Sequence, residues 1–382
     1  MIFSLEAIQA KHGDALLLHY GSAQAPRLAV IDGGPRGVYR RQLRPRLNAI
    51  RQARSPETVL PIRLLMVSHM DEDHITGVLD LTDDLLDYQD TEHPLPYAIR
   101  TVWHNSFDEI VGNRLRRPFE SLGDSFASGR EAPPRVALSR AGAGVAMSVR
   151  QGRLLRNHLQ GLDLPVNRPF RTIVARGNRR RTVRLGSGLT FTIIAPSERR
   201  IRELRSEWDA QLARLRSASA IDRLRIAADY VDQSVFNLAS IVVLARFRRR
   251  TMLLTGDARG DDILEGLTEL GLMRRGKMHV DILKLPHHGS DRNVETDFFR
   301  RVTARHYVVS GDGKYGNPEI ATFQMLSDAR GQQQYTIHLT NREQRLVNFF
   351  RRERRRGRRY GVAFRRADRP SLRIDLLGAP RY

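Results

Sequence analysis

The sequence has no cysteine, little lysine and no long apolar run, and each absence narrows what the protein can be. None of the 382 residues is cysteine, which excludes disulfides and thiolate metal ligands. No stretch approaches the ~18 unbroken apolar residues of a membrane-spanning helix. The first residues also lack the basic and apolar blocks of a signal peptide. We therefore expect a cytoplasmic protein with no membrane partner.

Lysine supplies only four of the 64 basic residues, and arginine supplies the rest. Codon usage in a GC-rich genome can explain the choice of arginine over lysine, but it does not explain a net charge of +22. An excess this large favours a polyanionic partner, and arginine makes forked contacts with phosphate. We expect nucleic acid, DNA or RNA, as the partner; an acidic protein is the alternative.

The densest group of potential metal ligands is the segment 68–74, Ser-His-Met-Asp-Glu-Asp-His. An apolar run over residues 62–67 precedes it and an apolar segment follows, so we expect a strand, a short loop and a helix. Imidazole and carboxylate groups suit Zn²⁺, Mn²⁺ or iron. One such loop can supply a pair of ligands to each of two ions. The alternative is a charged loop in which Asp73 caps the helix.

Two later apolar strands also end in ligand-type residues. The run 251–256 leads to Asp257, and the run 280–286 leads to His287 and His288. Open α/β sheets place functional groups at the edge formed by the carboxyl ends of their strands. If the three strands are neighbours, their side chains converge, and the two oxygens of Asp257 could bridge two ions.

In this order, the motifs resemble those of the metallo-β-lactamase-fold hydrolases. They are His-x-Asp-x-Asp-His at 69–74, Leu-Leu-Thr-Gly-Asp at 253–257 and Leu-Pro-His-His-Gly-Ser at 285–290. They look most like the branch that forms the soluble domain of the competence DNA-uptake channel proteins. The resemblance covers about residues 1–105 and 185–345. It implies an α/β fold, a four-layer αββα sandwich, and two divalent metal ions, Zn or Mn.

Two positions depart from the wider pattern of these hydrolases. Most of the superfamily has His where this chain has Asp71, although the competence-type branch shares the Asp. An oxygen ligand at this position favours Mn²⁺ more than an all-imidazole site would. Asn317 stands where that branch usually has His, which puts in doubt a proton-donating or phosphate-binding role at this position.

The resemblance assigns roles to individual residues. The expected metal ligands are His69, Asp71, Asp73, His74, Asp257 and His288. Asp73 and His287 would also be catalytic, with His287 positioning the phosphate or protonating the leaving group; His287 and His288 could exchange roles. Asp32 would orient a metal ligand, or only support the turn before Gly33 and Gly34. The expected substrate-binding residues are Ser290, Lys314 and Tyr315.

We expect one hydrolase domain over residues 1–345, with a helical insertion at about 106–170, and an Arg-rich extension over 346–382. Aromatic residues between the arginines of the extension could stack on bases, or the extension could be a solvated, self-repelling tail. A helix within 200–236 has apolar residues three to four apart. This stripe would pack in the core or form a contact with a second copy or another protein.

These observations favour a metal-dependent phosphodiesterase, and among such enzymes a nuclease acting on DNA or RNA. One alternative is a phosphodiesterase for a small or polymer-linked substrate, such as a cyclic nucleotide or a phosphorylcholine ester. The other is a non-catalytic nucleic-acid-binding subunit whose metal is structural. The complete ligand set argues against this last alternative.

Overall fold

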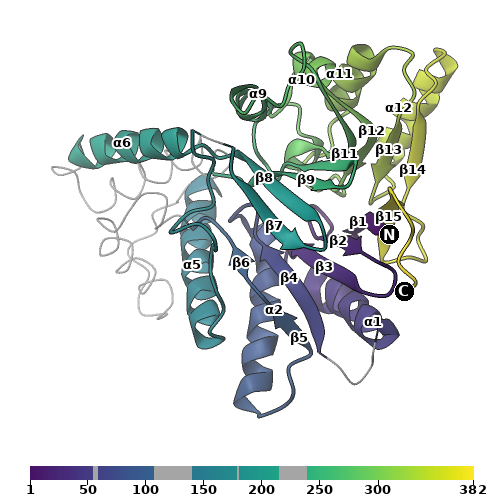
Figure 1. The fold of residues 1–382 in the computed structure, drawn as a ribbon. Coiled ribbons are helices and arrows are strands. Elements are labelled where there is room, and N and C mark those ends of the chain that lie inside the picture. Colours follow the sequence, from purple (N-terminus) through teal and green to yellow (C-terminus); the bar gives the residue numbers. More distant parts are fainter. Residues whose placement is uncertain (55–58, 107–139, 179, 215–238) are drawn as a thin grey trace.

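The computed structural model of the chain describes residues 1–382 apart from 55–58, 107–139, 179 and 215–238. Its elements form two sheets that pack face to face, with helices on the outer side of each sheet (Figure 1). The fold is therefore the α/β, four-layer αββα sandwich that we predicted from the sequence.

The first sheet has seven strands and contains most of the N-terminal part of the chain. Its strands are β1 (Ile2–Ile8), β2 (Leu16–Gly21), β3 (Pro26–Ile31), β4 (Leu60–Met66), β5 (Tyr97–Ile99), β6 (Val102–Trp103) and β15 (Ser371–Asp375). They are ordered β15-β1-β2-β3-β4-β5, and β6 also pairs with β4. Because β3, β4 and β6 are parallel, their carboxyl ends lie at one edge of the sheet.

The second sheet has eight strands in the order β14-β13-β12-β11-β10-β9-β8-β7. The strands are β7 (Thr182–Gly186), β8 (Leu189–Ala195), β9 (Val242–Phe247), β10 (Arg250–Leu254), β11 (Met278–Lys284), β12 (Val302–Val309), β13 (Thr336–Leu339) and β14 (Gly361–Phe364). From β10 to β14 all neighbours are parallel. Their carboxyl ends therefore also share one edge.

The helices divide between the two outer layers. The helices next to the first sheet are η1 (Tyr39–Leu43), α1 (Arg44–Arg54), α2 (Glu72–Asp90), α5 (Arg140–Gly161) and α6 (Glu198–Arg214). Those next to the second sheet are α9 (Gly260–Glu269), α10 (Thr296–Arg301), α11 (Ile320–Arg330) and α12 (Gln344–Arg355). Among the residues described, no helix combines the length and apolarity needed to cross a bilayer.

Three apolar clusters fill the spaces between the layers. One lies between the first sheet and its helices, one between the second sheet and its helices, and one between the two sheets. Because inner strands are covered on both faces, they read as nearly continuous apolar runs rather than as alternating patterns. All six residues of β2, Leu-Leu-Leu-His-Tyr-Gly, are buried, for example.

The segment 346–382, which we expected to be an extension, lies within the two sheets. The expected boundary at residue 345 falls inside α12, β14 pairs with β13, and β15 pairs with β1. The apolar face of α12 packs against the second sheet and consists of Leu346, Phe349 and Phe350, which are spaced as on one side of a helix. In the sequence, many arginines surround these residues and make the apolar spacing hard to recognise. Phe349, Phe350 and also Tyr360 thus belong to the core, which leaves these rings unavailable for stacking on bases.

The two expected helical regions are described in part. Helix α5 lies in the predicted insertion, while residues 107–139 are outside the described chain. Helix α6 forms the first part of the predicted 200–236 helix, and residues 215–238 are likewise outside it. Ile201 and Leu204 of α6 are buried in the first core cluster, so this part of the apolar stripe serves the core.

Candidate metal centre

Strands from both sheets end at the candidate centre. The segment 68–74 follows β4 and starts α2, Asp257 follows β10, and His287 and His288 follow β11. Helix α2 begins after Asp71, whose side chain makes no capping hydrogen bond, so Asp73 is not the N-cap. The structure thus brings together side chains that are more than 200 positions apart in the sequence.

The carboxylate of Asp257 lies among three imidazoles. Its Oδ1 is 3.2 Å from His74 Nε2, and its Oδ2 is 3.6 Å from His288 Nε2 and 3.8 Å from His287 Nε2. Asp257 and His288 are buried, and the His74 side chain is fully buried. Asp257 is therefore the common neighbour of the two strands from the second sheet and the loop from the first.

Asp73 and the pair His69–Asp71 complete the group of expected ligands. Asp73 places its Oδ2 3.2 Å from His288 Nε2 and its Oδ1 3.9 Å from His74 Nε2. His69 Nε2 is 2.9 Å from Asp71 Oδ2, and the His69 and His74 rings are 5.4 Å apart between centroids. All six expected ligands, together with His287, therefore lie in one region of the fold.

Asp32 holds His74 from the side opposite Asp257. Its Oδ2 is 3.0 Å from His74 Nδ1, and its Oδ1 accepts a 2.7 Å hydrogen bond from the Ser68 backbone N–H. The Ser68 hydroxyl also donates to Asp32. Since the Nδ1–H of His74 points to Asp32, its Nε2 is the atom directed at Asp257. This is the arrangement by which a carboxylate fixes the tautomer of a metal-binding histidine.

Asp14 has the corresponding position beside His288. Its Oδ1 is 3.6 Å from His288 Nδ1, and its Oδ2 is 2.7 Å from Lys284 Nζ. The hydroxyl of Ser310, which follows β12, donates to Asp14. Both Asp14 and Lys284 are buried, so the ion pair keeps a carboxylate ionised next to His288 without exposing it to water.

The backbone at His287 and His288 is held in a rarely populated conformation. Their φ angles are 45° and 52°, in the left-handed region that residues with a Cβ seldom adopt. Non-glycine residues in this region cost free energy and concentrate at functional sites. Asn293 braces the turn: its Oδ1 is 2.7 Å from His287 Nδ1, and its amide donates to the Asp257 carbonyl. His287 Nε2 is consequently free to face Asp257.

Two opposing effects set the pKa values of the centre: burial disfavours the charged form of each group, and neighbouring groups of opposite charge favour it. Burial would raise the pKa of Asp257, but His74, His288 and His287 outweigh it and hold this pKa well below its usual value. The pKa of Asp73 is likewise lowered to about 2, against the effect of burial, by His74 and His288. Burial would lower the pKa of His288, but Asp257 and Asp14 raise it to about 9. Asp257 and Asp73 are therefore ionised at neutral pH.

The residues present fit a divalent cation. His74 Nε2, His288 Nε2 and Asp257 Oδ1 are buried and make no hydrogen bond within the described part of the chain. One ligand atom each from Asp14, His74, Asp257 and His288 lies within 4.8 Å of the others. Facing lone pairs in a buried site need a positive charge between them, which a proton or a metal ion can supply. Imidazole nitrogen and carboxylate oxygen are donors that Zn²⁺ and Mn²⁺ accept.

Solvent can reach the centre from one side, which is formed by Asp71, Asp73 and His287. Their side chains are 44%, 21% and 33% exposed, respectively. Access from solvent to the centre is from this side, because His69, His74 and His288 are buried. The two residues expected to be catalytic are thus both accessible.

The expected substrate-binding residues lie around the centre rather than within it. Ser290 is buried directly after the His288 turn. Tyr315 is 70% exposed, with its ring edge-on to His12, and Lys314 lies over the Tyr315 ring. The Asn317 amide donates to the carbonyl of His287 at 3.2 Å, so Asn317 supports the left-handed turn.

Sequence reasoning missed the parts played by Asp14, Lys284 and Asn293. Asp14 lies between β1 and β2, in a segment whose sequence has no ligand motif. A signal was available at Lys284, because a lysine inside the apolar run 280–286 requires a buried carboxylate partner. Nothing in the local sequence marks Asn293, whose contact with His287 depends on how the turn closes.

Comparisons with known proteins give no assignment. No protein-family model matches the chain. Microtubule-associated protein 1A from Rattus norvegicus, Mus musculus and Homo sapiens is 38% identical over 64 residues, or 16% of this chain. The match spans 2% of the length of those relatives. The crystal structure of Zn²⁺-bound PqqB from Methylobacterium extorquens aligns with 98% of this chain and 100% of its own, with 10% identity and a TM-score of 0.39. A likeness at this level carries no argument about function.

Proposed function

We propose that the chain is a metal-dependent phosphodiesterase that cleaves nucleic acid, and that it belongs with the competence-type branch of the metallo-β-lactamase-fold hydrolases. The observation that carries the proposal is the position of Asp257, with three imidazole nitrogens within 3.8 Å and Asp73 beside them. The motif order of the sequence and the net charge of +22 support it further.

Two divalent cations, Zn²⁺ or Mn²⁺, held by the six expected ligands would supply an activated water and neutralise charge on the phosphoryl oxygens. The chain itself contributes position and protons. Asp32 and Asp14 aim His74 and His288 at Asp257. His287, whose Nδ1 is fixed by Asn293, has a side chain that is 33% exposed, and in the imidazolium form its Nε2–H could give a proton to the leaving oxygen.

The test is cleavage of single-stranded DNA, duplex DNA and RNA by the purified chain, each with Mn²⁺, Zn²⁺ or Mg²⁺. Asp257→Asn keeps the size of the side chain and removes its charge, so we expect cleavage to fall by at least about 10³-fold. Asp261→Asn is the matched control, because Asp261 is an exposed acid in the first turn of α9.

Cleavage by Asp261→Asn should equal that of the wild type. Equal cleavage by the Asp257→Asn variant would refute the assignment of the centre. If the wild type cleaves none of the three polymers but hydrolyses a small diester such as bis(p-nitrophenyl) phosphate, the phosphodiesterase chemistry stands and the nucleic-acid substrate does not.

A further inference from the structure

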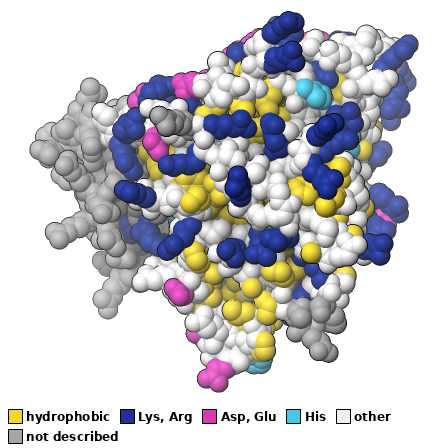
Figure 2. Space-filling model, in the orientation of Figure 1, with side chains coloured by type: hydrophobic (Ala, Val, Ile, Leu, Met, Phe, Trp, Pro, Cys, Tyr) yellow, Lys and Arg dark blue, Asp and Glu magenta, His cyan; other side chains and the backbone are white. Residues whose placement is uncertain are grey.

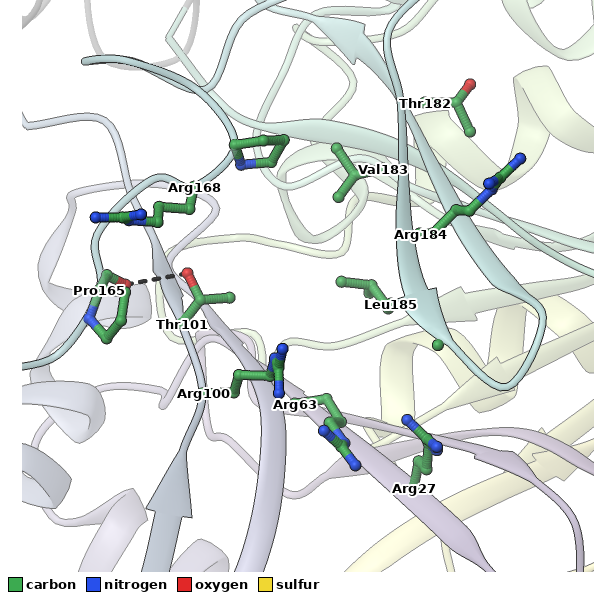
Figure 3. Close-up of a pocket in the computed structure, with 12 residues that line it drawn as sticks. Arg27, Arg63, Arg100, Thr101, Pro165, Arg168, Thr182, Val183, Arg184 and Leu185 are labelled. Atoms are coloured by element: carbon green, nitrogen blue, oxygen red, sulfur yellow. Dashed lines mark hydrogen bonds between the residues drawn. The ribbon is translucent and has the colours of Figure 1, made fainter.

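A second feature of the fold is a cavity that lies away from the metal centre, toward the other end of the first-sheet strands. The cavity, of about 860 Å³, is lined by Arg27 near the start of β3, Arg63 in the middle of β4, the segments 100–101 and 165–169, and β7 (Figure 3). This volume is typical of pockets for small organic ligands. Figure 2 shows arginine and lysine side chains spread over this face of the molecule, with few acidic ones among them.

The charge of this cavity has one sign. Five of its 12 lining residues are arginine and none is acidic. Arg27, Arg63 and Arg100 lie near one another on the first-sheet side, as Figure 3 shows. Within the described residues none of the three forms an ion pair with a carboxylate, whereas Arg46, Arg176 and other arginines do.

The three arginines also repel one another. The pKa of Arg63 is lowered, first by burial and then by Arg27 and Arg100. Tyr20 lies close by but does not balance them, because burial raises the pKa of its phenol to about 12 and its hydroxyl donates to the Leu185 carbonyl. Holding three mutually repelling cations close together raises the free energy of the folded protein, and a bound anionic ligand would offset this repulsion.

The backbone around the cavity is shaped to present these groups. The pairing of β3 with β4 shifts between Leu28–Ile62 and Ala29–Leu64, which makes Arg63 the extra residue of a bulge. The pairing of β7 with β8 shifts between Arg184 and Gly186, which makes Leu185 another. Bulges re-aim side chains and are frequent beside functional sites. At Gly186, φ is +86° and an added Cβ would lie 2.5 Å from Arg27 Nη1, so glycine leaves room for that guanidinium.

The rest of the lining combines apolar residues with Thr101, Thr182, Arg168 and Arg184. Val183 and Leu185 are partly buried against the cluster between the sheets, and Pro165 and Pro169 also line the cavity. A ligand here would meet guanidinium groups at one side and apolar surface at the other. Such a cavity differs from the long basic groove with aromatic platforms that tracks a nucleic-acid strand.

We propose that this cavity binds a small organic anion with two or more linked phosphate groups, of the nucleoside triphosphate class. Arg27, Arg63 and Arg100 would bind the phosphates through forked contacts. The apolar walls would cover the organic part. The site is independent of the proposed cleavage, because it uses other residues at the other end of the same strands.

The test is calorimetric titration of the full chain with ATP and with inorganic tripolyphosphate, both free of metal, near physiological ionic strength. We expect one site per chain. Replacing Arg27, Arg63 and Arg100 by Gln should weaken binding by about tenfold or more, since each lost contact is a charged hydrogen bond. The matched control replaces Arg351, Arg352 and Arg355, exposed arginines of α12, by Gln and removes the same net charge. It should retain the wild-type affinity within about twofold.

The outcomes separate this site from the metal centre and from general charge attraction. The Asp257→Asn variant should bind ATP as the wild type does; loss of binding there would place the ligand at the metal centre and overturn the proposal. Equal weakening in both triple variants, or no binding of either phosphate compound, would also overturn it. Tight binding of only a long single-stranded DNA, with no competition by ATP, would do the same. If the triple variant does not fold, Arg100→Gln alone, at an exposed position, carries the test.

Discussion

The two ends of the same strands carry opposite chemistry. Strand β3 has Arg27 near its start and Asp32 just after its end, and β4 contains Arg63 and leads to His69. At about 3.3 Å per residue, Arg27 and Asp32 are about 16 Å apart along the strand. At one end, buried carboxylates and imidazoles face each other; at the other, half-buried and exposed arginines form no ion pair with any carboxylate of the described residues.

The difference shows why the net charge alone says little about where an anion binds. At the metal centre every charged group has an opposite or complementary neighbour, and the strained turn at His287 and His288 is braced from several sides. The arginine cavity has no such internal balance. A site whose charges are left unbalanced depends on a ligand for its neutrality, so the two ends should respond differently to the same kind of substitution.

The largest effect on stability should come from an arginine that is paired. The guanidinium of Arg46 lies 2.7 Å from Glu6, whose side chain is 2% exposed. Arg46→Gln leaves a buried carboxylate without its ion partner and should lower the free energy of unfolding by about 3 kcal/mol. Chemical denaturation measures this, with Arg63→Gln as the unpaired counterpart. If Arg46→Gln were no more destabilising than Arg63→Gln, the contrast between paired and unpaired arginines would fail.

The pH dependence of the same pair has a defined sign. Burial would raise the pKa of Glu6, but hydrogen bonds from His19 and Arg46 lower it from 4.5 to about 2. The stabilisation by ionised Glu6 is therefore fully present above pH 4.5 and is lost as the pH falls toward 2. The stability difference between wild type and Glu6→Gln should shrink over that interval and stay constant from pH 5 to 7.

The second prediction concerns stabilisation by a metal ion, which should bind at the metal centre and not at the arginine cavity. A divalent ion that binds only the folded chain stabilises it by about 2.7 kcal/mol at a concentration of 100 Kd. Mn²⁺ or Zn²⁺ should accordingly raise the Tm of wild-type protein by several degrees. The gain should disappear in Asp257→Asn and persist in the variant that lacks Arg27, Arg63 and Arg100. Differential scanning fluorimetry with and without chelator tests this, and an equal rise in Asp257→Asn would place the metal elsewhere.

How far the sequence predicts the molecule depends on whether a feature is local. The metal-centre side chains follow short apolar runs, so strand ends and ligand types could be read directly, and motif order supplied the αββα fold. Leu346, Phe349 and Phe350 were masked by neighbouring arginines, so α12 and the strands after it were not foreseen as core. Arg27, Arg63 and Arg100 come from separate segments and carry no shared motif. They come together through the tertiary fold, and Arg63 lies at a bulge that no local sequence pattern predicts.

The third prediction concerns a residue that acts through another. Asp32→Asn is sterically mild, because Asn tolerates the φ of 60° at this position. It weakens the acceptor for His74 Nδ1–H, and loss of such partners typically lowers metal affinity or activity by about 10–100-fold. Competition with a chromophoric chelator measures the affinity. A drop in Tm of the metal-free protein without a change in metal affinity would mean that Asp32 only supports the turn.

The smallest expected effect is a gain in stability, whereas the first prediction was a loss. Arg63 is opposed by Arg27 and Arg100, and its pKa is lowered by burial and by both of them. Arg63→Gln removes this repulsion while keeping a polar side chain at the bulge, so the free energy of unfolding should rise by up to about 0.5 kcal/mol. The gain should be larger at low ionic strength, because salt screens the repulsion between exposed charges. Denaturation at two salt concentrations measures it. A loss of stability would mean that Arg63 has a favourable partner in the folded chain. The arginines of the cavity would then serve the stability of the fold rather than the binding of an anion.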